Sequence, residues 1–109
     1  MDFNYRYIAS LLDQLPAIPA DSIISQSLNN DSRMSATLFG FAAGQELSEH
    51  TSSYPAVLTF LQGEAEVTLG TDRMEAKAGA WVYMPPRMPH SIRAKSTVVM
   101  LLLMVKDQS

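Results

Sequence analysis

Most of the chain is divided into short segments with the character of β-strands. After Pro19, seven stretches are rich in β-branched or aromatic residues and are bounded by Gly, Pro, Asn, Asp or Ser. They cover residues 23–28, 34–41, 57–61, 64–69, 80–84, 91–94 and 97–105. Polar and apolar residues alternate strictly in 64–69, which is typical of a strand with one solvated face, and residues 70–73 are predicted to turn the chain. Many short strands separated by turn signals predict an all-β sandwich or barrel.

The segment before these strands has a different periodicity. Its apolar residues recur at helical spacing, and they are Tyr7, Ile8, Leu11, Leu12 and Leu15. Asn4 is a candidate cap, and Pro16 and Pro19 close the segment. We predict a short amphipathic helix that packs on the outside of the barrel, with partner binding as the alternative role.

Length and composition restrict the classes of protein that remain. The chain has 109 residues, of which 47% are hydrophobic and 17% charged, so one folded domain is expected over 1–109, with a helical arm at 1–20 and a barrel at 21–109. A net charge of -3 without a basic run argues against nucleic-acid binding, and the absence of cysteine excludes disulfides and thiol nucleophiles. The longest apolar run, 98–105, is too short to span a membrane, and no signal-peptide pattern is present. We therefore predict a cytoplasmic protein without a membrane partner.

The last predicted strand is apolar on both faces. One face of 97–105 is expected to line the core. The other face must then be covered by the N-terminal helix or by a second subunit, so we predict a homodimer.

The two histidines lie in two patterned segments. Gly44 precedes His50 by six residues and Gly63 follows it by thirteen, while Gly79 precedes His90 by eleven with Pro85 between them. This arrangement resembles the two motifs of the cupin superfamily, G-x5-H-x-H followed by E-x6-G, and G-x5-P-x-G-x2-H-x3-N. In the first motif the chain has Gly44, His50, Ser52, Ala56 and Gly63, and in the second Gly79, Pro85, Arg87, His90 and Ala94. Six of these ten positions match and every spacing is kept. The resemblance implies a small cupin-like β-barrel, a jelly roll or double-stranded β-helix, and again a homodimer.

The same resemblance implies a metal site that is incomplete here. Cupins commonly bind a divalent ion such as Fe, Mn, Ni or Zn through two histidines and a glutamate of the first motif and one histidine of the second. Carried over by position, His50 and His90 are present, whereas Ser52 and Ala56 replace the other two ligands. Two imidazoles alone make a weak metal site, because a catalytic metal usually has three protein ligands. A third donor would have to come from Glu46, Tyr54 or Gln62. If the strand is regular, alternation from Ala56 places Gln62 on its inward side.

The predicted ligand site is the mouth of the barrel. Methionines cluster around the His90 strand and the last strand, where they serve as core or as a soft wall for an apolar ligand, and they are Met84, Met88, Met100 and Met104. Trp81 and Tyr83 add aromatic surface, and Arg87 is a solvated loop residue or a clamp for a carboxylate. The candidate ligand-binding residues are His50, Ser52, Tyr54, Gln62, Met84, His90 and Met104.

Three functions remain open from the sequence. The first is a small-molecule-binding cupin whose pocket is built around the two histidines. The second is a metal-dependent enzyme, such as a dioxygenase or isomerase, as cupins often are. The third is a structural or partner-binding subunit. No phosphate loop, dinucleotide fingerprint or nucleophile elbow is present, so no catalytic residue is assigned.

Overall fold

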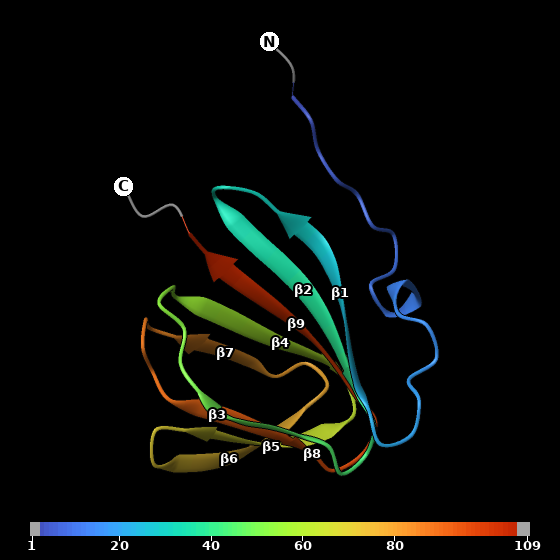
Figure 1. Cartoon of the computed structure of the whole chain (residues 1–109). Helices are drawn as coiled ribbons and strands as arrows, with labels where there is room; N and C mark the ends of the chain where they lie inside the picture. Colours follow the sequence, from blue (N-terminus) through green and yellow to red (C-terminus); the bar gives the residue numbers. More distant parts are fainter. Residues whose placement is uncertain (1–2, 107–109) are drawn as a thin grey trace.

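The structure, a computed structural model, describes residues 3–106 and consists of two antiparallel sheets that face each other (Figure 1). The large sheet contains β1 (Ile23–Asn30), β2 (Met34–Phe41), β4 (Ala56–Gln62), β7 (Trp81–Met84) and β9 (Val98–Val105), in the order β1-β2-β9-β4-β7. The small sheet contains β3 (Glu46–His50), β5 (Glu64–Leu69), β6 (Asp72–Lys77) and β8 (His90–Ala94), in the order β3-β8-β5-β6. The predicted all-β jelly roll is confirmed.

All seven predicted strand segments are strands in the structure, but two further strands were not predicted. These are β3 and β6, which form the two edges of the small sheet. Most of their residues are exposed, so they lack the alternation of buried and exposed side chains that identifies a strand in a sequence. The turn predicted at 70–73 is consequently shorter, because Leu69 already pairs with Asp72.

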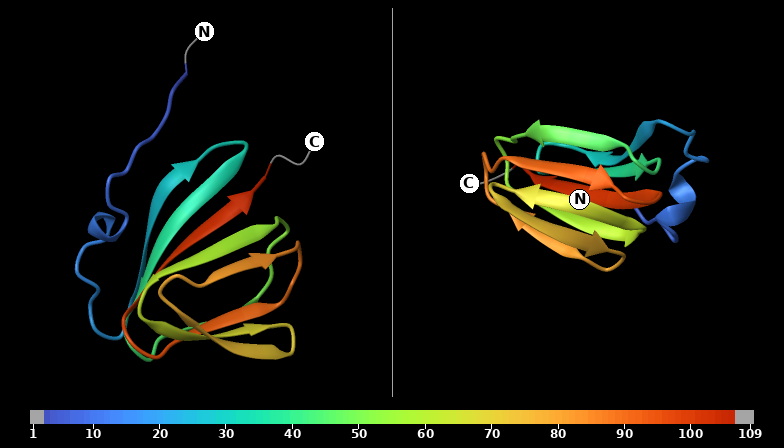
Figure 2. Two further views of the ribbon diagram at one scale, coloured as in Figure 1. Left: turned by 180° about the vertical axis from the view of Figure 1, so that it is seen from behind. Right: turned by 90° about the horizontal axis from the view of Figure 1, so that it is seen from below.

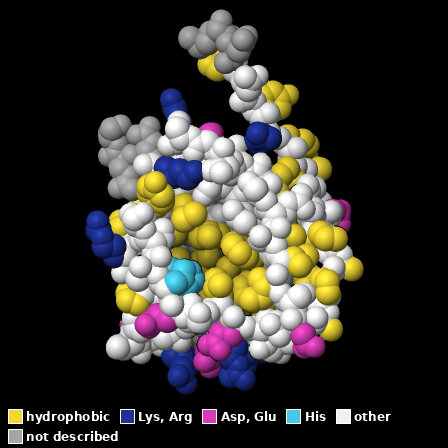
Figure 3. Space-filling view, viewed as in Figure 1, with side chains coloured by type: hydrophobic (Ala, Val, Ile, Leu, Met, Phe, Trp, Pro, Cys, Tyr) yellow, Lys and Arg dark blue, Asp and Glu magenta, His cyan; other side chains and the backbone are white. Residues whose placement is uncertain are grey.

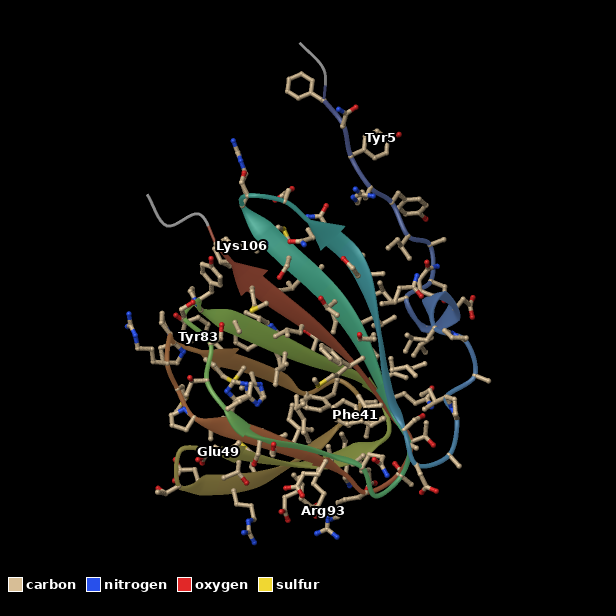
Figure 4. All side chains as sticks on the ribbon, in the orientation of Figure 1. Tyr5, Phe41, Glu49, Tyr83, Arg93 and Lys106 are labelled. Carbon is tan, nitrogen blue, oxygen red and sulfur yellow. The ribbon has the colours of Figure 1, made fainter. Side chains whose placement is uncertain are left out.

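The core lies between the sheets. The largest fully buried side chains of this core come from both sheets and are Phe41, Leu58, Phe60, Val67, Met84, Ile92, Val98 and Met100. The sheets diverge from one end of the molecule toward the other, with Phe41 near the end where they meet and Glu49 and Tyr83 at the open end (Figure 4). The two sheets therefore lie closer together at the Phe41 end than at the end of Glu49 and Tyr83, which we call the open end.

The N-terminal segment covers part of the outer face of the large sheet (Figure 2). Ile18 and Leu15 lie so close to Gly40 of β2 that a Cβ there would meet their side chains at 2.7 and 3.0 Å. The predicted short helix is present only as a 3-10 turn, η1 (Leu12–Gln14), which has no side-chain cap. A helix this short is not stable by itself, and the sheet fixes the segment through Leu15 and Ile18 instead.

The remainder of that outer face is only partly covered. Leu101 and Leu103 of β9 are half-buried, and Trp81 and Tyr83 of β7 are 64% and 53% exposed. The N-terminal segment, one of the two covers predicted for β9, packs on β2 of this face, and the homodimer stays a prediction. Among the described residues, no helix has the length and apolarity to span a membrane.

Candidate functional site

His50 and His90 face each other at the open end of the barrel. His50 ends β3, His90 begins β8, and the two residues are direct cross-strand partners. Their ring centroids lie 4.1 Å apart at an interplanar angle of 58°. His50 is exposed, whereas His90 is only 7% exposed. Two motifs forty residues apart in the chain thus bring their imidazoles into contact.

Backbone carbonyls fix the protonation pattern of both imidazoles. The Nδ1 atom of His50 lies 2.8 Å from the carbonyl oxygen of Ser48, and that of His90 lies 2.9 Å from the carbonyl oxygen of Met88. A carbonyl oxygen can only accept a hydrogen bond, so each Nδ1 must carry the proton. In the neutral rings each Nε2 then has a free lone pair. Such a lone pair can coordinate a metal ion or accept a proton from a ligand.

The surroundings of His90 keep its ring neutral. Burial lowers the pKa of the His90 imidazole below its usual value, and positive charge on His50 lowers it further. The hydrogen bond to the Met88 carbonyl raises the pKa and opposes part of this shift. Because the net direction is downward, His90 offers a lone pair rather than a positive charge near pH 7.

The histidines line a pocket of about 420 Å³. Its walls come from β3, β4, β8, β9 and the loop after β3, and the lining residues are His50, Thr51, Ser52, Ser53, Tyr54, Ala56, His90, Leu102 and Met104. Figure 3 shows a histidine at the surface beside a patch of hydrophobic side chains on the same face. A larger hollow lies under the N-terminal segment against β1 and β2, but neither histidine lines it. We therefore place the candidate site at the histidine pocket.

Some of the predicted site residues meet at this pocket and others do not. Ser52, Tyr54 and Met104 line it together with the histidines. Met84 is buried in the core directly opposite Ala56, behind the pocket wall. Gln62 is exposed at the far end of β4, where six residues of strand place it about 20 Å from Ala56. Glu46, at the other end of β3 from His50, does not line the pocket either.

The pocket also contains residues that the sequence did not indicate. Thr51 and Ser53 contribute hydroxyl groups, and Leu102 contributes apolar wall. Thr51 and Ser53 flank the predicted residue Ser52 in the chain. Their position in the loop after His50 is the only sequence feature that could have indicated them.

Ser52 connects the loop to the barrel wall. Its Oγ accepts a hydrogen bond of 3.1 Å from the backbone N–H of Tyr54 and donates one of 3.5 Å to the sulfur of Met104. These two bonds fix the orientation of the hydroxyl, which as a neutral oxygen is a poor metal ligand in any case. Its effect is to hold the Met104 side chain in place.

Arg87, which is exposed, has a strained backbone conformation in the loop before β8. It stands where the second motif has glycine, and it keeps glycine-like geometry, with φ at +67°. Its backbone N–H donates a 2.7 Å hydrogen bond to the carbonyl of Ser52, which ties the two loops of the site together. A left-handed conformation is unfavourable for a residue with a Cβ.

We expect Arg87→Gly to stabilise the protein by about 0.5–1 kcal/mol, because relief of the strain exceeds the added freedom of glycine in the unfolded chain. Urea unfolding measures this difference. Arg87→Ala is the matched control, since it removes the charge and keeps the Cβ, and it should give no gain. Equal stabilisation by both variants would show that the charge, and not the backbone, is unfavourable.

The family is decided by the sequence match. The model of the family described as "Cupin domain" matches residues 37–106, which is well over half of the chain. The chain belongs to the cupin family. The crystal structure of the conserved SPY1581 protein of unknown function from Streptococcus pyogenes has 28% identity and a TM-score of 0.85 over 98% of this chain and 93% of that chain. A cupin superfamily protein from Desulfitobacterium hafniense has the same TM-score at 23% identity, over 98% of this chain and 97% of that one. A search of curated proteins gives no match to this cupin.

The donor set of this cupin does not fit the divalent ion expected of its family. Ala56 stands in place of the carboxylate, and the hydroxyl of Ser52 is already bonded. Among residues 3–106, no group of three or more His, Cys, Asp or Glu side chains gathers in metal-binding geometry. Two neutral imidazoles without a carboxylate hold Fe, Mn, Ni or Zn weakly. We derive no reaction step through such an ion.

Proposed function

We propose that this cupin binds an uncharged small molecule at the mouth of its barrel, between His50 and His90. One observation carries the proposal. Both Nδ1 atoms are bonded to backbone carbonyls, which leaves two Nε2 lone pairs at a pocket of about 420 Å³. Such lone pairs accept hydrogen bonds, so the ligand must supply N–H or O–H donors.

The pocket walls support a ligand with a polar head and an apolar body. Ala56, Leu102 and Met104 give an apolar floor, while Thr51, Ser53 and Tyr54 place hydroxyl groups in the lining. No Asp, Glu, Lys or Arg is among the lining residues, so the pocket offers no ion pair to a charged ligand. Sites of this kind, mostly apolar with a few convergent polar groups, are typical of small-molecule binding.

The two other functions have weaker support. A metal-dependent oxygenase or isomerase needs a strongly held ion, which the replacements at Ser52 and Ala56 do not favour. A purely structural subunit has no need for an open pocket in which two facing imidazoles have their outer nitrogens unused.

The experiment compares two aromatic probes of the same frame. Catechol carries two O–H donors, and veratrole, its dimethyl ether, carries none. Catechol titrated into protein with 15N-labelled histidines, in the presence of a chelator, should shift the Nε2 resonances of both His50 and His90, and veratrole should shift them much less. Equal shifts with both probes, or none with either, would contradict the proposal.

A further inference from the structure

We propose that His50, His90 and Met104 form a binding site for monovalent copper, Cu(I). This inference goes beyond the proposed function, because it assigns a metal that the family pattern does not predict. The residues that make the site unsuitable for Fe, Mn, Ni or Zn are the ones that suit a soft ion.

The first two donors are the imidazoles. Each Nδ1–H is bonded to a backbone carbonyl, at 2.8 Å for His50 and 2.9 Å for His90, so each ring presents Nε2 with a lone pair. This is the outer-shell arrangement that orients metal-binding histidines in proteins. The ring centroids, 4.1 Å apart, bring both rings to a single location.

The third donor is the thioether of Met104. Met104 lies directly across from Ala56 in the β4–β9 ladder, and directly opposed residues point to the same face of a sheet. Ala56 occupies the position of the family's carboxylate, and its small side chain leaves that space to its neighbours. Met104 is the neighbour that lines the pocket with both histidines.

The neighbourhood of Met104 reinforces its role as a donor. The hydroxyl of Ser52 donates to the Met104 sulfur at 3.5 Å, which restrains a side chain that is otherwise flexible and leaves a second sulfur lone pair. On the other side of Ala56, its partner in the ladder with β7 is Met84, so a second thioether flanks the same position from within the core. The carboxylate position is therefore bordered by sulfur on both sides.

This donor set selects among metals. Thioether sulfur is a soft ligand that favours Cu(I), and imidazole binds copper well. No anionic oxygen lines the pocket, which removes the ligand that Mn, Fe and Mg prefer. Two neutral nitrogens and one neutral sulfur leave a net charge of +1 with Cu(I), half of what a divalent ion would leave in the same partly buried site.

The experiment uses Cu(I) itself, kept reduced and anaerobic and offered as its coloured bicinchoninate complex. The full chain should withdraw about one equivalent of Cu(I) per chain, and X-ray absorption should show sulfur beside nitrogen in the first coordination shell. Met104→Leu is nearly isosteric and keeps the fold, and it should weaken Cu(I) binding by at least about tenfold and remove the sulfur signal. Met74→Leu, on the exposed edge strand β6, is the matched control and should bind as the unchanged protein does.

Three results would overturn the copper site: no withdrawal of Cu(I) by the unchanged chain, unchanged affinity in Met104→Leu, or an equal loss in Met74→Leu. The outcome is separable from that of the proposed function. The catechol titration is made on the unchanged chain in the presence of a chelator, so its result does not depend on a bound metal. A chain that binds catechol and not Cu(I) would refute only the metal site, and the reverse result would refute only the proposed ligand class.

Discussion

Gly63→Ala adds a single methyl group and should lower the free energy of unfolding by about 4 kcal/mol or more. Gly63 joins β4 of the large sheet to β5 of the small sheet with φ at +84°. A Cβ there would lie 2.0 Å from the carbonyl oxygen of Thr97 and 3.0 Å from the Cα of Val98. Both obstacles are backbone atoms, so they cannot move aside without displacing the start of β9, the central strand of the large sheet.

Gly70→Ala provides the control for this variant. Gly70 also has a positive φ, +62°, but a Cβ there would meet nothing within 4 Å. Its replacement should lower stability by only about 1 kcal/mol, the strain of the left-handed conformation alone. Urea unfolding of both variants measures the difference. Equal losses at the two glycines would mean that the contact with Thr97 does not limit the junction of the sheets.

Removal of both imidazoles should abolish the response to catechol. Each neutral hydrogen bond contributes about 1 kcal/mol, so His50→Ala should weaken binding by about 5-fold and the double variant with His90→Ala by about 30-fold. His50 is exposed, which means that its single variant tests binding with little effect on folding. Calorimetry or an NMR titration gives the affinities, and urea unfolding confirms that the variants fold.

Tyr83→Ala is the matched control for the histidine variants. Tyr83 is at the same end of the barrel, but it pairs with Val57 on the outer face of the large sheet and is 53% exposed. Its removal should leave catechol binding unchanged. If the double histidine variant is folded and keeps its catechol affinity within about twofold, the histidines are not the ligand contacts.

The sequence predicted the parts of this fold that local physical constraints determine. Strict alternation identified β5, and apolar runs bounded by turn residues identified β2 and β9, all three with nearly correct bounds. The spacing of Gly44, His50 and Gly63, and of Gly79 and His90, indicated that the two histidines belong to one site, and they are cross-strand partners. Edge strands β3 and β6 were missed because exposed side chains carry no periodic signal.

The remaining features depend on contacts between distant segments. Alternation along β4 predicted that Gln62 faces inward, but Gln62 is exposed and lies at the opposite end of the strand from Ala56, so it does not line the pocket. The juxtaposition of Ala56 with Met104 and Met84 arises only when β4 is placed between β9 and β7. The carbonyls that fix the two Nδ1 protons belong to the backbone of Ser48 and Met88, so no residue type reveals them.

The most direct test of the account is the tautomeric state of the two histidines in the metal-free protein. Long-range 1H–15N NMR spectra distinguish a protonated ring nitrogen from one with a lone pair. At a pH above both imidazole pKa values, the structure requires a protonated Nδ1 and a bare Nε2 on His50 and on His90. A proton on Nε2 of either ring would contradict the account, because that ring would then offer a donor, and not a lone pair, to the pocket.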